Sequence, residues 1–276
     1  MKKLLGIMLI LLITLSLAAC GQNSQNSTKT SIEAEREVKE TNTKKPVIAV
    51  SIVPQKTWVE AVGDFADVVV MIPPGKSPAN YAPSPKELQL FSKAAVYFAI
   101  GVPTEKVNVL SKVEDMNPGM TIIQLEKTAA ESYPERQFAS GKRDQHIWLS
   151  PKRTMVMVQE ISAVLAEKYP DEKEAFQANA AGYIKEIEAA DKEVKAALSG
   201  LKTKKFIVYH PAFGYFAGDY GLEMIALEQD GKESTPQRRQ EVVDVAKKEG
   251  IRVIFYQAEI DSSQSRSTAE EIGGKT

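Results

Sequence analysis

Residues 171–201 read DEKEAFQANAAGYIKEIEAADKEVKAALSGL, and this stretch decides how the rest of the chain is organised. It contains no proline, and its apolar residues recur every three or four positions, as on one face of an α-helix. These residues are Phe176, Ala180, Tyr183, Ile187, Ala190, Val194, Leu198 and Leu201. We predict one helix of roughly 30 residues, about 45 Å long. It is either a coiled-coil partner or a rigid backbone joining two lobes, and its place between two α/β halves favours the second.

Short apolar runs lie on both sides of this helix, and most are nearly continuous, as in strands that are covered on both faces. The clearest runs are Val47–Val53, Val68–Ile72, Phe206–Tyr209 and Val253–Tyr256, and the weaker ones are Val96–Ile100, Thr121–Leu125 and Met224–Leu227. Helical patterns lie between them at Thr57–Gly63, Pro85–Lys93, Lys152–Lys168 and Gln237–Glu249. The alternation predicts an α/β fold with mostly parallel sheets.

The two halves repeat one another faintly. The order strand, helix, strand, Ser/Thr-Pro, strand occurs once around Ser84-Pro85 and again around Thr235-Pro236. We therefore expect two similar lobes, residues 46–168 and 204–276, joined by the helical segment 169–203. Ligands in such sheets bind beyond the carboxyl ends of the strands, which places a cleft between the lobes.

The first residues are typical of an export signal. Two lysines precede an apolar run that ends in Leu17-Ala18-Ala19-Cys20-Gly21, and this run is too short for a comfortable membrane span. We predict a signal peptide at 1–19. Small residues before a lone cysteine resemble the bacterial lipobox, in which that cysteine is lipidated; an ordinary secretory signal is the alternative. Residues 20–45 are polar and predict a flexible tether, so we expect an extracytoplasmic protein anchored to the cell membrane through Cys20.

The composition excludes several classes of protein. The chain has 35 Lys and Arg against 36 Asp and Glu, a formal net charge of −1, so no global charge favours nucleic-acid binding. One cysteine excludes an internal disulfide and any CxxC motif. No glycine-rich phosphate loop and no nucleophile elbow is present. The chain has two histidines, so a metal site would be small or completed by oxygen ligands.

Both histidines fall where the cleft is expected. His210 ends the apolar run that begins at Phe206, and His146 lies just before the helical pattern that begins near Lys152. One imidazole then comes from each lobe. A single histidine in such a place is usually a hydrogen-bonded structural residue, but two facing histidines favour a divalent metal site.

Three motifs resemble one family, the zinc/manganese-type substrate-binding proteins of ABC importers. The segment His210-Pro211-Ala212-Phe213-Gly214-Tyr215-Phe216 is similar to its second-lobe signature, and Asp144–Pro151 resembles its D-P-H-x-W-L-D/S-P motif with Gln145 in place of Pro. Residues 72–78 resemble its V-P-P-G-x-x-P loop. The resemblance covers about residues 46–276. It implies a two-lobe fold, a metal ion in the cleft and an ABC permease as partner.

The chain departs from that family's pattern in two places. The family loop usually reads P-H-x-Y-E-P and supplies a histidine, whereas this chain has Ala79 at that position. Family members also usually continue well past the segment that corresponds to Gly273-Gly274-Lys275. We therefore expect either a fragment or an incomplete second lobe.

Oxygen ligands would have to complete the site formed by His146 and His210. Glu259 follows a predicted strand on the cleft side and is our first candidate, although a surface carboxylate or a helix N-terminal charge explains it equally well. Asn80, beside Ala79, is a weaker candidate. Two imidazoles and a carboxylate suit Zn²⁺, and further oxygen ligands would suit Mn²⁺.

The sequence thus predicts a monomeric extracytoplasmic lipoprotein that captures Zn²⁺, or next Mn²⁺, for an ABC permease and performs no covalent chemistry. One alternative is a protein of the same architecture that binds an organic ligand or a metal chelate. Another is a metal-dependent hydrolase using His146, His210 and Glu259 with a bound water. A truncated product without function is the third.

Overall fold

The computed structural model describes residues 45–228, 232–257 and 263–276. The chain divides into two units, Met1–Thr43 and Lys44–Thr276, and the second contains every described residue. The predicted signal peptide, Cys20 and the predicted tether as far as residue 44 lie outside the described residues, and so does Glu259. Those predictions therefore stay predictions.

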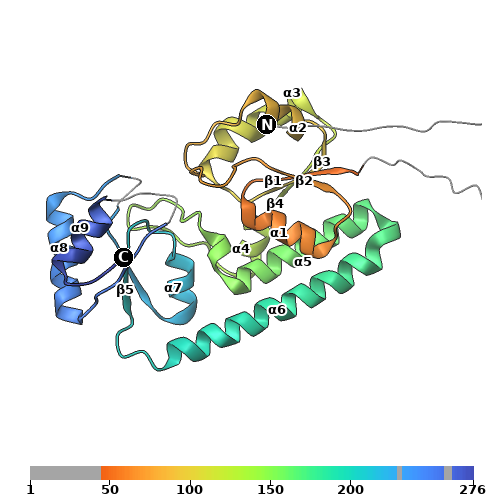
Figure 1. The fold of residues 1–276 in the computed structure, drawn as a ribbon. Helices are drawn as coiled ribbons and strands as arrows, with labels where there is room; N and C mark the ends of the chain where they lie inside the picture. The colour runs from red at the N-terminus through yellow and green to blue at the C-terminus, as the bar shows by residue number, and fades with distance from the viewer. Residues whose placement is uncertain (1–44, 229–231, 258–262) are drawn as a thin grey trace, which may run out of the picture. The chain divides into compact units, whose positions relative to one another are not determined.

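The described strands of the first lobe form a parallel sheet in the order β2-β1-β3-β4 (Figure 1). The strands are β1 (Val47–Val50), β2 (Asp67–Val70), β3 (Ala94–Ala99) and β4 (Thr121–Gln124). Strands β1 and β2 pair from Val47 opposite Asp67 to Val50 opposite Val70. Both central strands are buried on both faces, as their continuous apolar sequences predicted.

Helices cover both faces of this sheet. They are α1 (Val53–Val62), α2 (Pro85–Phe91), α3 (Val113–Met116), α4 (Leu125–Ser132) and α5 (Pro151–Lys168), with short turns η1 (Glu105–Val109), η2 (Leu110–Lys112), η3 (Ile147–Leu149) and η4 (Pro170–Glu172). Ile48 and Val50 of β1 belong to one core with residues of α1, α4 and α5, whereas the intervening Ala49 belongs to the opposite core with Phe91 of α2. Alternate residues of one strand thus fill two different cores.

Helix α6 (Lys173–Ser199) is the predicted long helix and has 27 residues. Its first turns bury Phe176 and Ala180 in the core of the first lobe. Its last turn brings Leu198 to the second lobe, where that side chain lines a cavity. The prediction of an α/β fold with two lobes and one long connecting helix is therefore confirmed. Among the described helices, none is both long and apolar enough to cross a membrane.

The described strands of the second lobe repeat the order of the first. They are β5 (Lys205–Val208), β6 (Glu223–Ala226) and β7 (Ile254–Phe255), and they form a parallel sheet in the order β6-β5-β7, equivalent to β2-β1-β3. The helices are α7 (Gly214–Tyr220), α8 (Pro236–Glu249) and α9 (Ser263–Glu271). Helices α8 and α9 contribute to one core with Ile207 and Ile254 of the sheet.

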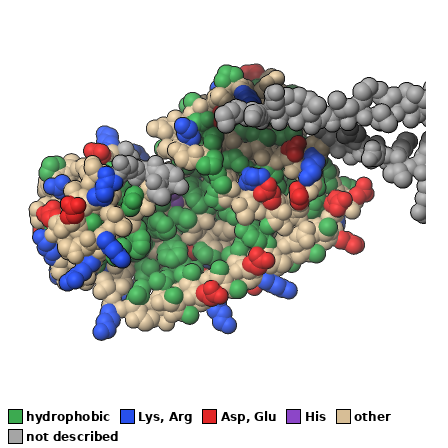
Figure 2. Space-filling view, viewed as in Figure 1, with side chains coloured by type: hydrophobic (Ala, Val, Ile, Leu, Met, Phe, Trp, Pro, Cys, Tyr) green, Lys and Arg blue, Asp and Glu red, His purple; other side chains and the backbone are tan. Residues whose placement is uncertain are grey.

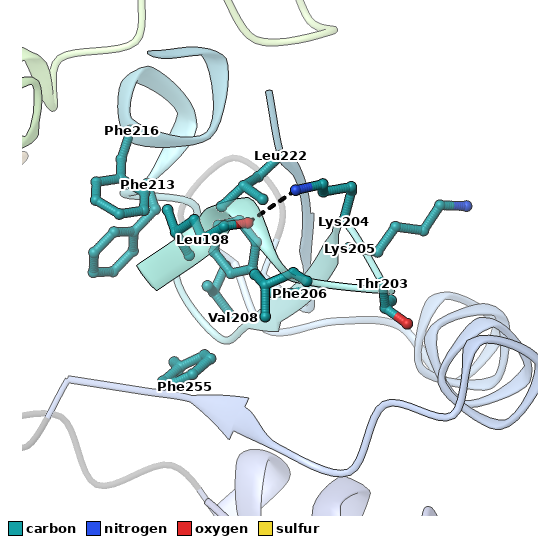
Figure 3. A pocket seen from close by; sticks show the side chains of 11 residues that line it. Leu198, Thr203, Lys204, Lys205, Phe206, Val208, Phe213, Phe216, Leu222 and Phe255 are labelled. Atoms are coloured by element: carbon teal, nitrogen blue, oxygen red, sulfur yellow. Dashed lines mark hydrogen bonds between the residues drawn. The ribbon is translucent and has the colours of Figure 1, made fainter. Parts of the chain in front are cut away.

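The other face of the second sheet is partly open. Val208 of β5, Phe255 of β7 and Phe213 before α7 line a cavity of about 300 Å³, shown in Figure 3. Phe255 is 53% exposed there. Figure 2 shows hydrophobic side chains gathered between this lobe and the long helix.

Some predicted boundaries are wrong. The strand predicted at Val47–Val53 ends at Val50, and α1 begins at Val53 rather than Thr57. The cause is local: Pro54 has no N–H for a sheet, and Gln55 Oε1 accepts hydrogen bonds from the backbone N–H groups of Ser51 and Ile52 at 3.0 and 3.1 Å. Helices α3, α4 and α9 were not predicted.

Candidate metal centre

His146 lies in the loop before η3 and is buried, with 4% of its surface exposed. The fully buried Asp144 accepts two hydrogen bonds with its Oδ1 atom, from the backbone N–H of His146 at 3.0 Å and from its ring Nδ1 at 2.9 Å. Burial lowers the pKa of His146, and the adjacent Asp144 carboxylate opposes that shift. The imidazole is therefore fixed in orientation, and its neutral form is favoured.

His210 follows β5 and has a matching carboxylate. Its Nδ1 atom lies 2.9 Å from Oε2 of Glu228, which follows Leu227 after strand β6. The backbone N–H of Glu228 donates to the carbonyl of Tyr209 at 2.9 Å and so extends the pairing of the two strands. The side chain of His210 is 24% exposed, against 6% for His146.

The two imidazoles meet at their remaining ring nitrogens. Nε2 of His210 lies 3.1 Å from Nε2 of His146, and the ring planes are 81° apart. If each Nδ1–H donates to its carboxylate, both Nε2 atoms present lone pairs, and these repel unless a proton or a metal lies between them. Two nitrogens bound to one tetrahedral Zn²⁺ at about 2.0–2.1 Å would lie about 3.3 Å apart. The pair thus has nearly the spacing that one shared ion requires.

Aromatic side chains border the buried histidine. The ring of Trp148 lies 5.3 Å from that of His146, centre to centre, and the ring of Phe138 lies 6.5 Å away. Both contacts are edge-on. These rings exclude water from one side of His146, which agrees with its lowered pKa.

The predicted oxygen ligands Asn80 and Glu259 stay predictions. Asn80 and Ala79 are exposed in the turn after Pro78, and Glu259 lies outside the described residues. In the part of the chain that the structure describes, no three His, Cys, Asp or Glu side chains form a group that could hold a metal ion. Near this turn, the hydroxyl of Tyr81 donates to Glu87.

Sequence reasoning missed the two carboxylates behind the histidines. Asp144 was part of a quoted motif but was given no role, and Glu228 was not considered. A signal was available for Glu228, since it follows a weak strand at the end where a site was expected. Carboxylates that accept from the distal nitrogen of a ligand histidine are a regular feature of metal sites.

Known proteins resemble the whole described body. The family model for ZnuA, zinc-uptake complex component A periplasmic, matches residues 48–276. The zinc-binding lipoprotein AdcA of Streptococcus pneumoniae is 31% identical over 234 residues, which are 79% of this chain and 46% of that protein. The high-affinity zinc uptake system protein ZnuA of Bacillus subtilis is 27% identical over 100% of this chain and 87% of that protein.

A solved structure agrees with the sequence comparisons. A crystal structure of ZnuA superposes with a TM-score of 0.78 at 33% identity, covering 84% of this chain and 89% of that one. The present chain spans about half the length of the AdcA relatives that it matches. Because the family model covers most of the chain, this protein belongs to the ZnuA family.

Proposed function

We propose that this protein is the extracytoplasmic metal-binding component of an ABC importer and that its cargo is Zn²⁺. The observation that carries the proposal is the 3.1 Å separation of the two Nε2 atoms, each imidazole being held from behind by a carboxylate. The names of AdcA and ZnuA, which refer to zinc, support the choice of ion.

The ligand chemistry favours zinc among the divalent ions. Imidazole nitrogen is a common zinc ligand, whereas Mg²⁺ and Ca²⁺ prefer oxygen. His146 and His210 would supply two ligands, and a carboxylate or water would supply the rest. Glu259 stays our predicted carboxylate ligand, and Mn²⁺ stays the second candidate ion. No covalent chemistry is part of this proposal.

The remaining parts of the proposal concern the cellular setting. The ion would be delivered to a membrane permease of the ABC type, by a monomer anchored through lipidated Cys20. The family description, which places zinc-uptake component A in the periplasm, supports an extracytoplasmic location.

Replacement of each histidine tests the function. In the full-length chain, His146→Ala and His210→Ala should each weaken zinc binding by more than about 100-fold, which exceeds the usual effect of an outer-shell change. Competition with a chromophoric chelator measures the affinity. Gln177→Ala is the control, and because Gln177 is exposed on α6 and is not a candidate ligand it should change the affinity less than twofold.

Two results would contradict the proposal. Unchanged zinc affinity in both histidine variants would show that the pair is not the site. If the wild-type protein bound no bare ion, an organic ligand or a preformed chelate would be the better candidate.

A further inference from the structure

A carboxylate of the second lobe is held by the first lobe beside the histidine pair. Asp219, in helix α7, accepts a hydrogen bond from Ser150 Oγ at 2.5 Å and one from Arg153 Nη1 at 3.0 Å, and it forms an ion pair with Lys152 Nζ at 2.6 Å. Ser150, Lys152 and Arg153 lie at the N-terminus of α5. The α5 dipole also favours a negative charge there. We call these four residues the α7–α5 clamp.

The central ion pair of the clamp is nearly buried, whereas the side chain of Lys152 is 38% exposed. The side chains of Asp219 and Arg153 are each 9% exposed. The Arg153 guanidinium lies 4.7 Å from the centre of the Tyr215 ring and 5.4 Å from that of Tyr133, and its Nη2 donates to the carbonyl of Pro134 at 3.1 Å. A buried cation with this many contacts cannot be hydrated easily if its anion is removed.

The clamp joins the two chain segments that carry the histidines. Ser150 follows His146 by four residues, and α7 begins four residues after His210. A second contact supports the same junction, because the hydroxyl of Tyr215 accepts a hydrogen bond from the backbone N–H of Arg136 at 2.9 Å. Rotation of one lobe against the other would therefore break a buried ion pair close to both imidazoles.

We infer that Asp219 is a positioning residue: the α7–α5 clamp fixes the register of the two lobes so that the Nε2 atoms of His146 and His210 stay at ligand spacing. The inference rests on the proposed function because it takes the identity of the ion from it. The geometry of the clamp does not depend on that identity. It predicts that metal capture needs little movement of the lobes, because the pair is preorganised.

The variant Asp219→Asn tests this role. It keeps the size of the side chain and one oxygen acceptor but removes the charge that Arg153 and Lys152 share. The chain has two histidines, so its imidazole nuclear magnetic resonance signals are simple to assign. In the full-length, metal-free protein we expect the wild type to give a nuclear Overhauser effect between the two rings, whose centres are 5.0 Å apart. Asp219→Asn should lose most of it and should bind Zn²⁺ at least about tenfold more weakly.

The control is Asp244→Asn, which removes the same charge from an exposed position on α8. If Asp219→Asn is too unstable to purify, Ser150→Ala removes one hydrogen bond to the same carboxylate and should shift both measurements in the same direction by less. The inference is wrong if the purified clamp variant matches Asp244→Asn in both the ring contact and zinc affinity. If the wild type shows the ring contact but binds no zinc, only the proposed function is contradicted. The ring contact in the variants would then still test whether the clamp positions the two histidines.

Discussion

The carboxylate behind His146 offers the sharpest test of how this site holds an ion. In Asp144→Asn the side-chain oxygen remains available to accept from the imidazole Nδ1 and from the backbone N–H of His146, so the ring keeps its orientation. What changes is the charge. Asp144 is 0% exposed, so no water molecule can take the place of its carboxylate beside the imidazole. We expect zinc affinity to fall because a neutral amide no longer raises the basicity of the imidazole.

The magnitude follows from the distance. Asp144 Oδ1 lies 2.9 Å from Nδ1 of His146, and an ion bound to Nε2 lies on the far side of the ring. The carboxylate oxygen and the ion are therefore about 7 Å apart. One negative charge and a divalent cation at that distance interact by about 5 kcal/mol at an effective dielectric constant of 20 and by about 1 kcal/mol in water. Between these limits we expect a loss of about 10–100-fold, or about 1.4–2.8 kcal/mol.

The assay is competition for zinc with a chromophoric chelator, with urea unfolding measured in parallel. The matched change on the other histidine is Glu228→Gln, whose parent side chain is 11% exposed and so better screened; its loss should lie at the lower end of the range. Zinc affinity in Asp144→Asn within about twofold of the wild type, with unchanged unfolding, would refute the reasoning.

Two other changes test buried positions elsewhere in the chain and beside Asp144. Burial raises the pKa of Glu105 from 4.5 to about 7, so its contribution to stability is fully present below pH 4.5 and is lost as the pH rises through 7. Relative to Glu105→Gln, the free energy of unfolding of the wild type in urea should fall by up to about 3 kcal/mol across that interval, and parallel pH profiles would contradict this. In Gly214→Ala the new Cβ would lie 2.4 Å from Arg136 Nε and Asp144 Oδ2. Unfolding should become easier by about 1–3 kcal/mol and zinc binding weaker. Gly218→Ala, with nothing within 4 Å, should leave zinc binding unchanged and should make unfolding harder, because Ala is favoured over Gly inside a helix.

Much of the fold could be predicted because its signals are local. The apolar period of three and four in 171–201 predicts α6, and continuous apolar runs predict the central strands. Helix α9 could not be found this way, because its buried positions are small or polar residues, Ser265, Thr268 and Ala269. They pack well only against neighbours that the sequence does not specify.

The candidate site was predictable only in part, for a similar reason. His146 and His210 were found because histidines are rare in this chain and both follow recognisable segments. Their carboxylate partners are ordinary acidic residues among 36, and only the folded chain shows which of them face an imidazole. Glu228 is separated from His210 by helix α7 and strand β6, so no short spacing could connect them.

The unequal exposure of the two histidines gives the proposed site a direction. If the proposed site binds zinc, an incoming ion would first meet the more accessible His210 and exchange some of its water there. It reaches the deeply placed nitrogen of His146 only after losing more of its hydration shell. Departure follows the reverse order, with the inner bond broken first. On this proposal the site would be open on the His210 side, and a partner that collected the ion would approach from there.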